Sequence, residues 1–324
     1  MPKLTLVFSL LGIAVLAAVP LFPQVVYPVF VMKLLCMVLF ACAYNLLLGF
    51  AGIMSFGHAA FLGTAAYLTG YCMKAFGLST EVGILAGTLS ATALGVVFGA
   101  LAIRRQGIYL SMITLALAQM MYFIFLQAKF TGAEDGMQQV PRGYLFGLID
   151  LRDDTSLYYL VLTTVGGGLW LIWRTIHSPF GEVLRAIREH EPRAISLGYK
   201  VQKFKLLAFT LSAGLSGLAG SLKTLVFQLA ALTDVHWQTS GDVVLMTLLG
   251  GMHTVFGPAI GAFIITALQY YLDAFGQWVT VVVGAIFIAC VSVFRQGVAG
   301  TLNKIRRSDM IRTRDVSLNA KSLP

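Results

Sequence analysis

Charged residues are scarce in this chain. Aspartate, glutamate, lysine and arginine make up 11% of its 324 residues, whereas a soluble domain carries about 25%. Hydrophobic residues reach 58%, and the mean hydropathy is +0.82. The composition therefore excludes an ordinary soluble domain and indicates an integral membrane protein. A net charge of +9 would suggest nucleic acid binding in a soluble protein, but here the basic residues lie in loops and in the tail.

Motifs of several catalytic and transport classes are also missing. No G-x-x-x-x-G-K-[ST] sequence occurs, so this chain does not hydrolyse ATP through a P-loop. There is no HExxH, no GxSxG and no pair of intramembrane carboxylates, so no enzymatic or metal site is predicted. The apolar runs lack an acidic series that would relay protons or sodium, and a TVGYG potassium filter is absent. The four cysteines form no CxxC pair and are interpreted as packing residues.

What the chain does contain is a series of apolar runs, most of them near 20 residues, a length that spans a bilayer as a helix. They cover residues 4–19, 25–48, 58–73, 82–103, 109–127, 157–176, 206–227 and 279–294. We interpret the first run as a retained span rather than a signal peptide. Residues 242–272 read as a half-helix, a turn and a second helix. The expected fold is an all-α polytopic membrane protein of about eight or nine transmembrane helices, with a broken or re-entrant segment near 242–257.

The charges of the loops predict the orientation. With the N-terminus inside, most basic residues fall on the cytoplasmic side, namely Lys3, Arg104, Arg105, Arg174, Arg185, Arg188, Arg193, Lys200, Lys203, Lys205 and those of the tail. Only Lys74, Lys129, Arg142 and Arg152 fall outside, among acidic residues. This asymmetry follows the positive-inside rule. Both termini and the charged loop 178–205 are therefore predicted to be cytoplasmic, and the polar loop 129–156 external.

The 178–205 loop is the longest charged interruption between the apolar runs. Ser178 is suited to cap a helix and Pro179 to its first turn. Apolar Val183, Leu184, Ala186 and Ile187 are expected on one face, with Glu182, Arg185, Arg188 and Glu189 around the other. Pro192 would start a second short helix, which Gly198 would end. Two interpretations stay open from the pattern: a loop on the membrane surface, or a docking element for a cytoplasmic partner.

Two glycine-rich stretches, 48–63 and 249–262, each combine a Phe-Gly step with a nearby histidine and suggest a faint internal repeat. Broken intramembrane helices often line substrate paths, although a structural hairpin is the plainer alternative. His58 and His253 are interpreted as hydrogen-bonded packing histidines rather than ligands. Lys33 and Lys223 lie in apolar runs and are expected to extend their stems toward the membrane surface, with binding of a substrate carboxylate as the alternative.

Small-xxx-small glycine pairs also recur, at Gly83/Gly87, Gly95/Gly99 and Gly257/Gly261. Such pairs let helix backbones approach closely. The close contact lies either inside one subunit or with a second membrane chain, and the pattern alone leaves both open.

Several motifs resemble the permease subunits of branched-chain amino acid ABC importers. The likeness covers residues 44–300. It rests on Tyr44-Asn45 through Gly49 and Gly52 to Ser55-Phe-Gly57-His58 with Phe61, on Leu184-Arg185-Ala186-Ile187-Arg188-Glu189 with Ala194 and Leu197-Gly198, and on Gly250-Gly251 to Gly257-Pro258 with Gly261. His253 and Arg295 depart from it, since glycine and proline are expected there. The turn after Gly251 is therefore expected to differ from that of the family.

The resemblance implies a non-catalytic translocation subunit that imports leucine, isoleucine or valine. It implies a homologous second permease subunit, two cytoplasmic ABC ATPases that bind ATP and Mg²⁺, and an extracytoplasmic binding protein. This chain itself would hold no cofactor and no metal. The location implied is the bacterial inner membrane. Residues 1–300 would form one permease domain and 301–324 a basic cytoplasmic tail.

The resemblance also implies roles for named residues. The ATPase-coupling residues would be Val183, Leu184, Arg185, Ala186, Ile187, Arg188, Glu189, Ala194, Leu197 and Gly198, with Val183, Leu184 and Ile187 inserting into the partner. The candidates for the translocation path are Tyr44, Asn45, Gly49, Gly52, Ser55, Gly57, His58, Phe61, Gly250, Gly251, His253, Gly257, Pro258 and Gly261. Glu134, Asp135 and Arg142 are candidates for docking the binding protein. A urea or short-amide importer permease, or a carrier or channel that works alone, remain the alternatives.

Overall fold

The computed structural model describes residues 27–128, 131–252 and 254–272, together with 16, 19–21, 281, 282, 284, 285 and 288. Most of the predicted spans 4–19 and 279–294 lies outside the described residues. So do the tail 301–324 and His253.

The described chain is almost entirely helical. Its long helices are α2 (Pro28–Asn45), α3 (His58–Ala75), α4 (Thr80–Ala102), α5 (Ile108–Gln127), α6 (Asp154–Ile176) and α9 (Val201–Phe227). Shorter helices are α7 (Pro179–Glu189), α8 (Glu191–Ser196), α10 (Trp237–Gly250) and α11 (Gly257–Leu272), with turns of π- or 3-10-helix at η1 (Val19–Leu21), η2 (Leu46–Ala51), η4 (Ala133–Asp135) and η5 (Leu232–Asp234). Four two-residue strands pair antiparallel, β1 (Met137–Gln138) with β4 (Leu229–Ala230) and β2 (Tyr144–Leu145) with β3 (Ile149–Asp150).

Five of the described helical segments are long and apolar enough to cross a membrane. They are Pro28–Ala51, Thr80–Ala102, Ile108–Gln127, Asp154–Ile176 and Val201–Phe227. The expected boundaries are close to the observed ones: the run 109–127 is the helix Ile108–Gln127. The prediction of an all-α polytopic membrane protein is confirmed.

Helix α9 forms the centre of the bundle, packed against α2, α3 and α4. Small residues bring the backbones together, since a Cβ at Gly217 of α9 would overlap Ala91 of α4. Similarly, a Cβ at Gly87 of α4 would overlap Thr69 of α3, whose hydroxyl donates to Ser221 Oγ at 2.9 Å. The small-residue pairs of α4 therefore pack inside this one subunit.

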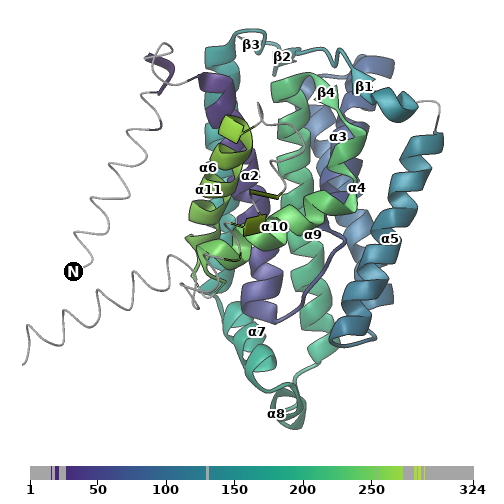
Figure 1. The fold of residues 1–324 in the computed structure, drawn as a ribbon, viewed down its shortest axis with the longest axis vertical. Helices are drawn as coiled ribbons and strands as arrows, with labels where there is room; N and C mark the ends of the chain where they lie inside the picture. Colours follow the sequence, from purple (N-terminus) through teal and green to yellow (C-terminus); the bar gives the residue numbers. More distant parts are fainter. Residues whose placement is uncertain are drawn as a thin grey trace, which may run out of the picture.

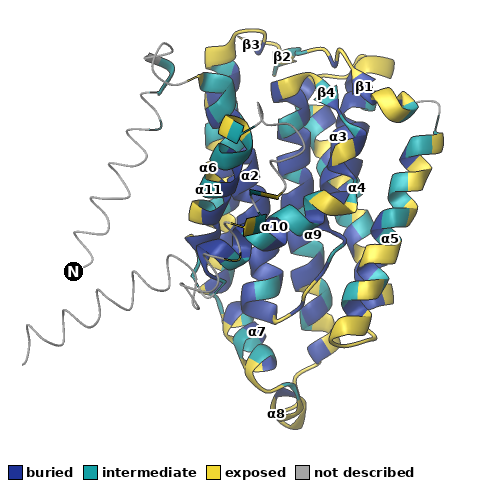
Figure 2. Ribbon diagram, in the orientation of Figure 1, coloured by how far each residue is buried: buried dark blue, intermediate teal, exposed yellow. Residues whose placement is uncertain are grey.

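Helix α5 lies at the periphery of the bundle. Only 22% of its apolar window is buried, against 72% for α9. Figure 2 shows exposed residues along much of α5 and a buried interior around α9. The exposed side chains of α5 are largely apolar, among them Ile108, Met112 and Phe123. Such a face suits contact with lipid or with another membrane chain.

The two ends of the bundle carry different structures (Figure 1). Helices α7 and α8 project from one end, and the pairs β1–β4 and β2–β3 lie at the other. The sequence predicts that these ends face opposite sides of the membrane. The loop 178–205 and the loop 129–156 are thus separated by the length of the bundle.

The expected interruption near 242–257 is present, because α10 ends at Gly250 and α11 begins at Gly257. Helix α10 begins at Trp237, five residues before the expected start at 242, and ends at Gly250, so that it has 14 residues. At 1.5 Å per residue it is about 21 Å long, too short for a hydrocarbon core of about 30 Å. In Figure 1 it crosses in front of α9 near mid-height, and α11 then runs back along α2.

Candidate functional site

The first broken stretch interrupts the helix that starts as α2. Its backbone widens into the π-helical turn Leu46–Ala51, and Gly52 ends that turn with φ of 69°. Residues with a Cβ seldom adopt this left-handed conformation, so glycine is suited to the position. The chain then runs without regular structure to Gly57, after which α3 begins at His58. The break is therefore built into the sequence.

His58 holds this break to the centre of the bundle. Its ring is buried, with Nε2 2.9 Å from Ser212 Oγ and Nδ1 3.3 Å from Ser55 Oγ. The Ser212 hydroxyl donates its single proton to the carbonyl of Ala43 at 2.7 Å. Nε2 therefore donates to Ser212 Oγ, and Nδ1 shares a hydrogen bond with Ser55. His58 is thus a packing histidine with both nitrogens in use, as expected.

The second broken stretch joins α10 to α11. Gly251 follows α10 with φ of 110°, and α11 begins at Gly257 with Pro258 in its first turn. Proline fits there because its missing N–H needs no intrahelical partner. Gly250 and Gly261 lie against backbone atoms of Gly257 and Met246, so that a Cβ at either position would overlap them.

The two breaks lie against each other. Asn45 Nδ2 donates to the carbonyl of Thr254 at 2.9 Å, across 209 positions of sequence. A Cβ at Gly49 would overlap the carbonyl oxygen of Met252. Ser240 of α10 in turn accepts from the backbone N–H of Ala59 in the first turn of α3, at 2.9 Å. The two stretches that resemble each other in sequence thus form one contact region.

Most residues assigned to the translocation path pack inside this region. Tyr44, Asn45, Gly49, Ser55, Gly57, His58, Phe61, Gly250, Gly251, Gly257, Pro258 and Gly261 are buried, Gly52 is exposed, and His253 lies outside the described residues. The aromatic rings of Tyr44, Phe61 and Phe209 surround the His58 ring at centroid distances of 4.8, 5.3 and 5.9 Å. In this conformation these residues join helices. Their part in a path stays a prediction.

We expect Gly261→Ala to destabilise the protein because the added methyl group would push α11 away from the Met246 carbonyl of α10. Overpacking of this kind typically costs about 1–3 kcal/mol. Thermal unfolding in detergent would show a lower midpoint. The control is Gly166→Ala on α6, where a Cβ would meet no atom within 4 Å. That change should leave stability equal or slightly higher, and equal midpoints for both variants would contradict the expectation.

The predicted helix pair at the cytoplasmic loop is observed as α7 and α8. Pro179 and Pro192 stand in their first turns, as expected. Ser178 occupies the position before α7, but its hydroxyl donates backward to the Thr175 carbonyl at 2.6 Å, so its side chain does not cap the helix. The expected apolar face is correct except at Ala186, which is exposed.

The expectation that Leu184 and Ile187 insert into a partner is wrong. Both are buried within this chain, with exposures of 0% and 2%. Leu184 belongs to a buried cluster with residues of η2, α3 and α9, and Ile187 packs with Ala194 and Val201. Because α7 uses its apolar face to hold itself to the bundle, that face is not free for an ATPase.

Arg188 also points into the chain. Its guanidinium donates to the carbonyl of Gly49 in the first break, and its Cγ would lie 2.7 Å from a Cβ at Gly52. Arg185 lies over the ring of Phe50, 5.4 Å from the centroid, and pairs with Glu182 at 2.8 Å. Arg188 was expected among the residues that contact the ATPases, but its side chain instead joins α7 to the first break.

An ion pair connects α8 to α9. Lys205 Nζ and Glu191 Oε2 are 2.7 Å apart, and both side chains are largely shielded from solvent. Sequence reasoning placed Lys205 only among the loop charges. The two residues are 14 positions apart, a spacing that no helix period predicts. The turn at Gly198 (φ 86°) brings them together.

The end of α8 and the turn after it expose an apolar tip, formed by Ile195, Leu197 and Tyr199. Ile195 is 57% and Leu197 68% exposed, whereas Ala194 is buried under them. Of these three, only Leu197 was among the expected coupling residues. Large apolar side chains at the far end of a charged loop are typical of a surface that another protein covers.

A cavity of about 420 Å³ lies between this loop and the first break. Gly52, Arg105, Ser111, Glu191 and Lys205 are among its lining residues. The cavity shows that the 178–205 loop, the turn between α4 and α5, and the break at Gly52 meet at one place.

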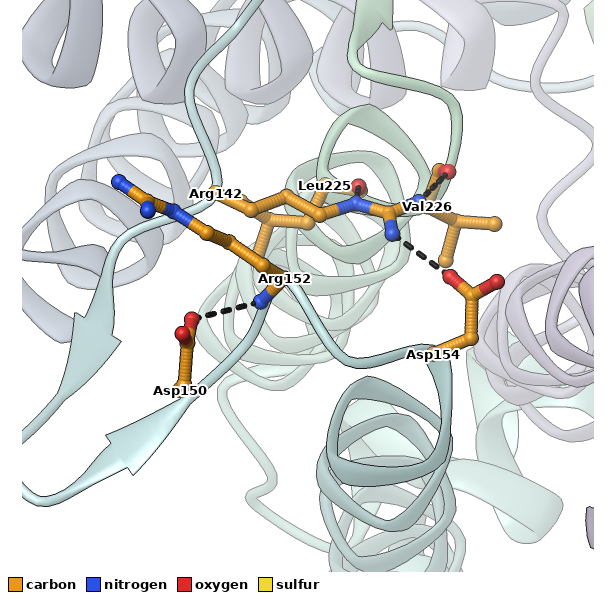
Figure 3. Close-up of polar contacts among 6 residues, drawn as sticks. All are labelled: Arg142, Asp150, Arg152, Asp154, Leu225 and Val226. Atoms are coloured by element: carbon orange, nitrogen blue, oxygen red, sulfur yellow. Dashed lines mark hydrogen bonds and ion pairs between the residues drawn. The ribbon is translucent and has the colours of Figure 1, made fainter.

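At the opposite end, Arg142 is a structural residue (Figure 3). Its Nε donates to the carbonyl of Leu225 at 3.0 Å and a terminal nitrogen to that of Val226 at 2.6 Å, while the other meets Asp154 Oδ1 at 2.7 Å. It therefore satisfies carbonyls at the C-terminal end of α9, where a positive charge is favoured. Its side chain is 10% exposed, so its assignment to a docking surface is wrong, whereas Glu134 and Asp135 are exposed as expected.

We expect Arg142→Ala to loosen the 129–156 loop, because two helix-end carbonyls and Asp154 lose their donor. Hydrogen bonds to charged groups contribute about 1.5–3 kcal/mol. Limited proteolysis should cut this loop faster. Arg152→Ala is the matched control, since that guanidinium lies 6.0 Å from the Tyr144 ring and such exposed contacts contribute about 0.5–1 kcal/mol. Equal cleavage of the two variants would exclude a special role for Arg142.

The expectation that the Lys223 side chain extends to the membrane surface is wrong. Its ammonium instead pairs with Asp234 of η5, and the two side chains are 17% and 5% exposed. This partner could not be predicted from residue order, because η5 lies beyond the end of α9, where the chain turns back through β4.

Comparison with known proteins gives one consistent result. The family model described as "Branched-chain amino acid transport system / permease component" matches residues 29–291. The high-affinity branched-chain amino acid transport system permease protein LivM of Escherichia coli (strain K12) is 26% identical over 267 residues, which are 75% of this chain and 63% of LivM. LivM of Salmonella typhimurium is 27% identical over the same shares. The chain thus matches less than two thirds of the length of these relatives.

More distant relatives include a permease that is named for another substrate. The ribose import permease protein RbsC of Bacillus subtilis (strain 168) is 30% identical over 151 residues, which are 45% of this chain and 44% of RbsC. No solved structure matches the chain.

Proposed function

We propose that this chain, which belongs to the family of permease components of branched-chain amino acid transport systems, is a membrane-spanning subunit of an ATP-binding cassette importer for leucine, isoleucine or valine. One observation carries the proposal. The 178–205 loop projects from the bundle with an exposed apolar tip, while its other side is fastened to the broken helix. A loop with these contacts can transmit the movement of a bound cytoplasmic partner to the broken helix at the centre of the bundle.

The coupling mechanism follows from the contacts. The tip formed by Ile195, Leu197 and Tyr199 would fit a groove on an ATPase subunit. Movement of α8 would reach α9 through Lys205 and Glu191, and movement of α7 would reach the first break through Arg188. From there the bond between Asn45 and Thr254 leads to the second break. Both breaks would then change together as the ATPases close.

The partners proposed are a homologous second permease subunit, two ABC ATPases and an external binding protein. ATP and Mg²⁺ would be bound by the ATPases, and this chain would carry no catalytic residue. The binding protein would dock on the 129–156 loop, through exposed Glu134 and Asp135 and through the hairpin tip, where Phe146 is 72% and Leu148 88% exposed. The sequence did not single out this apolar tip.

The proposed location is the bacterial inner membrane, with the 178–205 loop and both termini in the cytoplasm. The charge asymmetry of the loops supports this orientation. Residues 1–300 are proposed as one permease domain and residues 301–324 as its cytoplasmic tail.

Reconstitution tests the proposal. The chain, its second permease, the ATPases and the leucine-loaded binding protein are assembled in proteoliposomes, and uptake of radiolabelled leucine is measured with and without ATP. We expect uptake only with ATP and with every component present. Uptake by this chain alone would show a self-sufficient carrier or channel. ATP-driven uptake of urea or acetamide in place of leucine would favour the amide importer.

A further inference from the structure

One carboxylate inside the bundle has no cationic partner among the described residues. Asp242 of α10 accepts a hydrogen bond from Gln269 of α11 at 3.1 Å. Asp234 and Asp154, by contrast, pair with Lys223 and Arg142. Gln269 is neutral and engages only one oxygen of the carboxylate, which offers about four acceptor sites in all. Most of the acceptor capacity of Asp242 is therefore unused by the described chain.

The position of Asp242 makes a carboxylate without a cationic partner energetically costly. Helix α10 crosses the bundle near mid-height, between the two ends that carry loops (Figure 1). A carboxylate at the centre of a membrane helix costs about 2.5–3.5 kcal/mol on insertion scales. A hydrogen bond to Gln269 alone does not need a charge, because a neutral amide would join α10 to α11 as well. The charge is explained if a cation arrives from outside this chain.

The described residues leave the face of α10 that carries Asp242 open. A Cβ at Gly241 would meet no atom within 4 Å, and Gln238, one turn earlier, is exposed. Asp242 itself is half-buried, and so is Gln269. A face that contains Gln238, Asp242 and Gln269 is too polar for contact with lipid tails. It must border a wet space or another protein, and a substrate could reach it there.

We propose that Asp242, oriented by Gln269, binds the ammonium group of an amino acid substrate during its passage. This inference rests on the proposed function, since it assigns the subsite for one end of the imported molecule. The chemistry is a charge-assisted hydrogen bond between –NH₃⁺ and the free acceptor sites of the carboxylate. Sugars and amides lack a cationic group, and Asp242 would give them no such bond.

The test uses the complete importer in proteoliposomes with radiolabelled leucine. Asp242→Asn keeps the shape and the bond to Gln269 but removes the charge, whereas Asp242→Glu keeps the charge. We expect Asn to lower the uptake rate at least tenfold and Glu to retain at least a third of it. Glu81→Gln, the same chemical change in the first turn of α4, is the matched control and should keep full uptake.

A second pair of variants guards against loss of folding in the first. Gln269→Lys places a tethered ammonium beside Asp242, which should hold the carboxylate and lower uptake at least tenfold in a well-folded complex. Gln269→Met removes the orienting hydrogen bond without adding a charge, so it should lose less uptake than Gln269→Lys. Wild-type uptake by both Asp242→Asn and Gln269→Lys would overturn the inference and leave the proposed function intact. Failure of the wild-type importer to transport leucine would instead refute the proposed function.

Discussion

Charge reversal at Arg188 is expected to lower ATP-driven leucine uptake at least about tenfold. The guanidinium donates to the Gly49 carbonyl and packs on Gly52, so it joins α7 to the first break. A hydrogen bond to a charged group contributes about 1.5–3 kcal/mol, and 1.4 kcal/mol is tenfold in an equilibrium constant. Arg188→Glu would replace this attraction by repulsion between a carboxylate and a carbonyl. Uptake and ATP hydrolysis are measured together in the reconstituted importer.

The two activities should separate in this variant. We expect the ATPases to remain bound and to hydrolyse ATP, because the exposed tip of α8 is unchanged, while transport per ATP falls. Arg188→Lys should recover part of the transport, since a lysine can still donate. Lys203→Glu reverses an exposed charge at the start of α9 and is the control, with uptake near wild type. Equal uptake by Arg188→Glu and Lys203→Glu would mean that the contact at Gly49 transmits nothing.

The pair formed by Lys223 and Asp234 is expected to be the electrostatic contact whose disruption costs most stability. Asp234 is buried and Lys223 nearly so, and removing one partner of such a pair typically costs about 3–5 kcal/mol because the other charge is left unpaired. Lys223→Met and Asp234→Asn should each lower the thermal midpoint of the detergent-solubilised protein. The double variant should regain much of the loss, since replacing both charges of a buried pair is often neutral.

The exposed pair of Glu182 and Arg185 provides the comparison. These side chains are 67% and 34% exposed, and such surface pairs contribute at most about 1 kcal/mol. Glu182→Gln should therefore leave the thermal midpoint nearly unchanged. A double variant of Lys223 and Asp234 that is as unstable as the two single losses combined would show that the two charges act independently.

The helices of this protein could be predicted because a bilayer imposes their length and polarity. The run 157–176 becomes the helix Asp154–Ile176, and the prolines at 179 and 192 start α7 and α8. Glycine at 52 and 251 indicated the two breaks, since both positions adopt positive φ. These are local properties of the chain, and they are readable from the order of residue types.

The direction of long side chains could not be predicted in this way. Arg188 lies on the polar face of α7 by periodicity, yet it reaches back to Gly49, which is 139 positions away. Arg142 stands among acidic loop residues but binds the end of α9. Lys223 meets Asp234 only because the chain reverses after α9. Tertiary packing determines each of these partners, because the long side chain of a lysine or arginine can reach several possible partners.

The central claim is that the α8 tip faces the cytoplasm and is covered by the ATPases. Leu197 follows α8 and Leu148 lies between β2 and β3, which are at opposite ends of the bundle in Figure 1. Both residues are exposed, so a cysteine at each reports on its side of the membrane. A membrane-impermeant maleimide should label Leu148→Cys in intact spheroplasts. It should label Leu197→Cys only in inverted vesicles, and more slowly when the ATPases are bound. Labelling of Leu197→Cys from outside, or at one rate with and without the ATPases, would contradict the account.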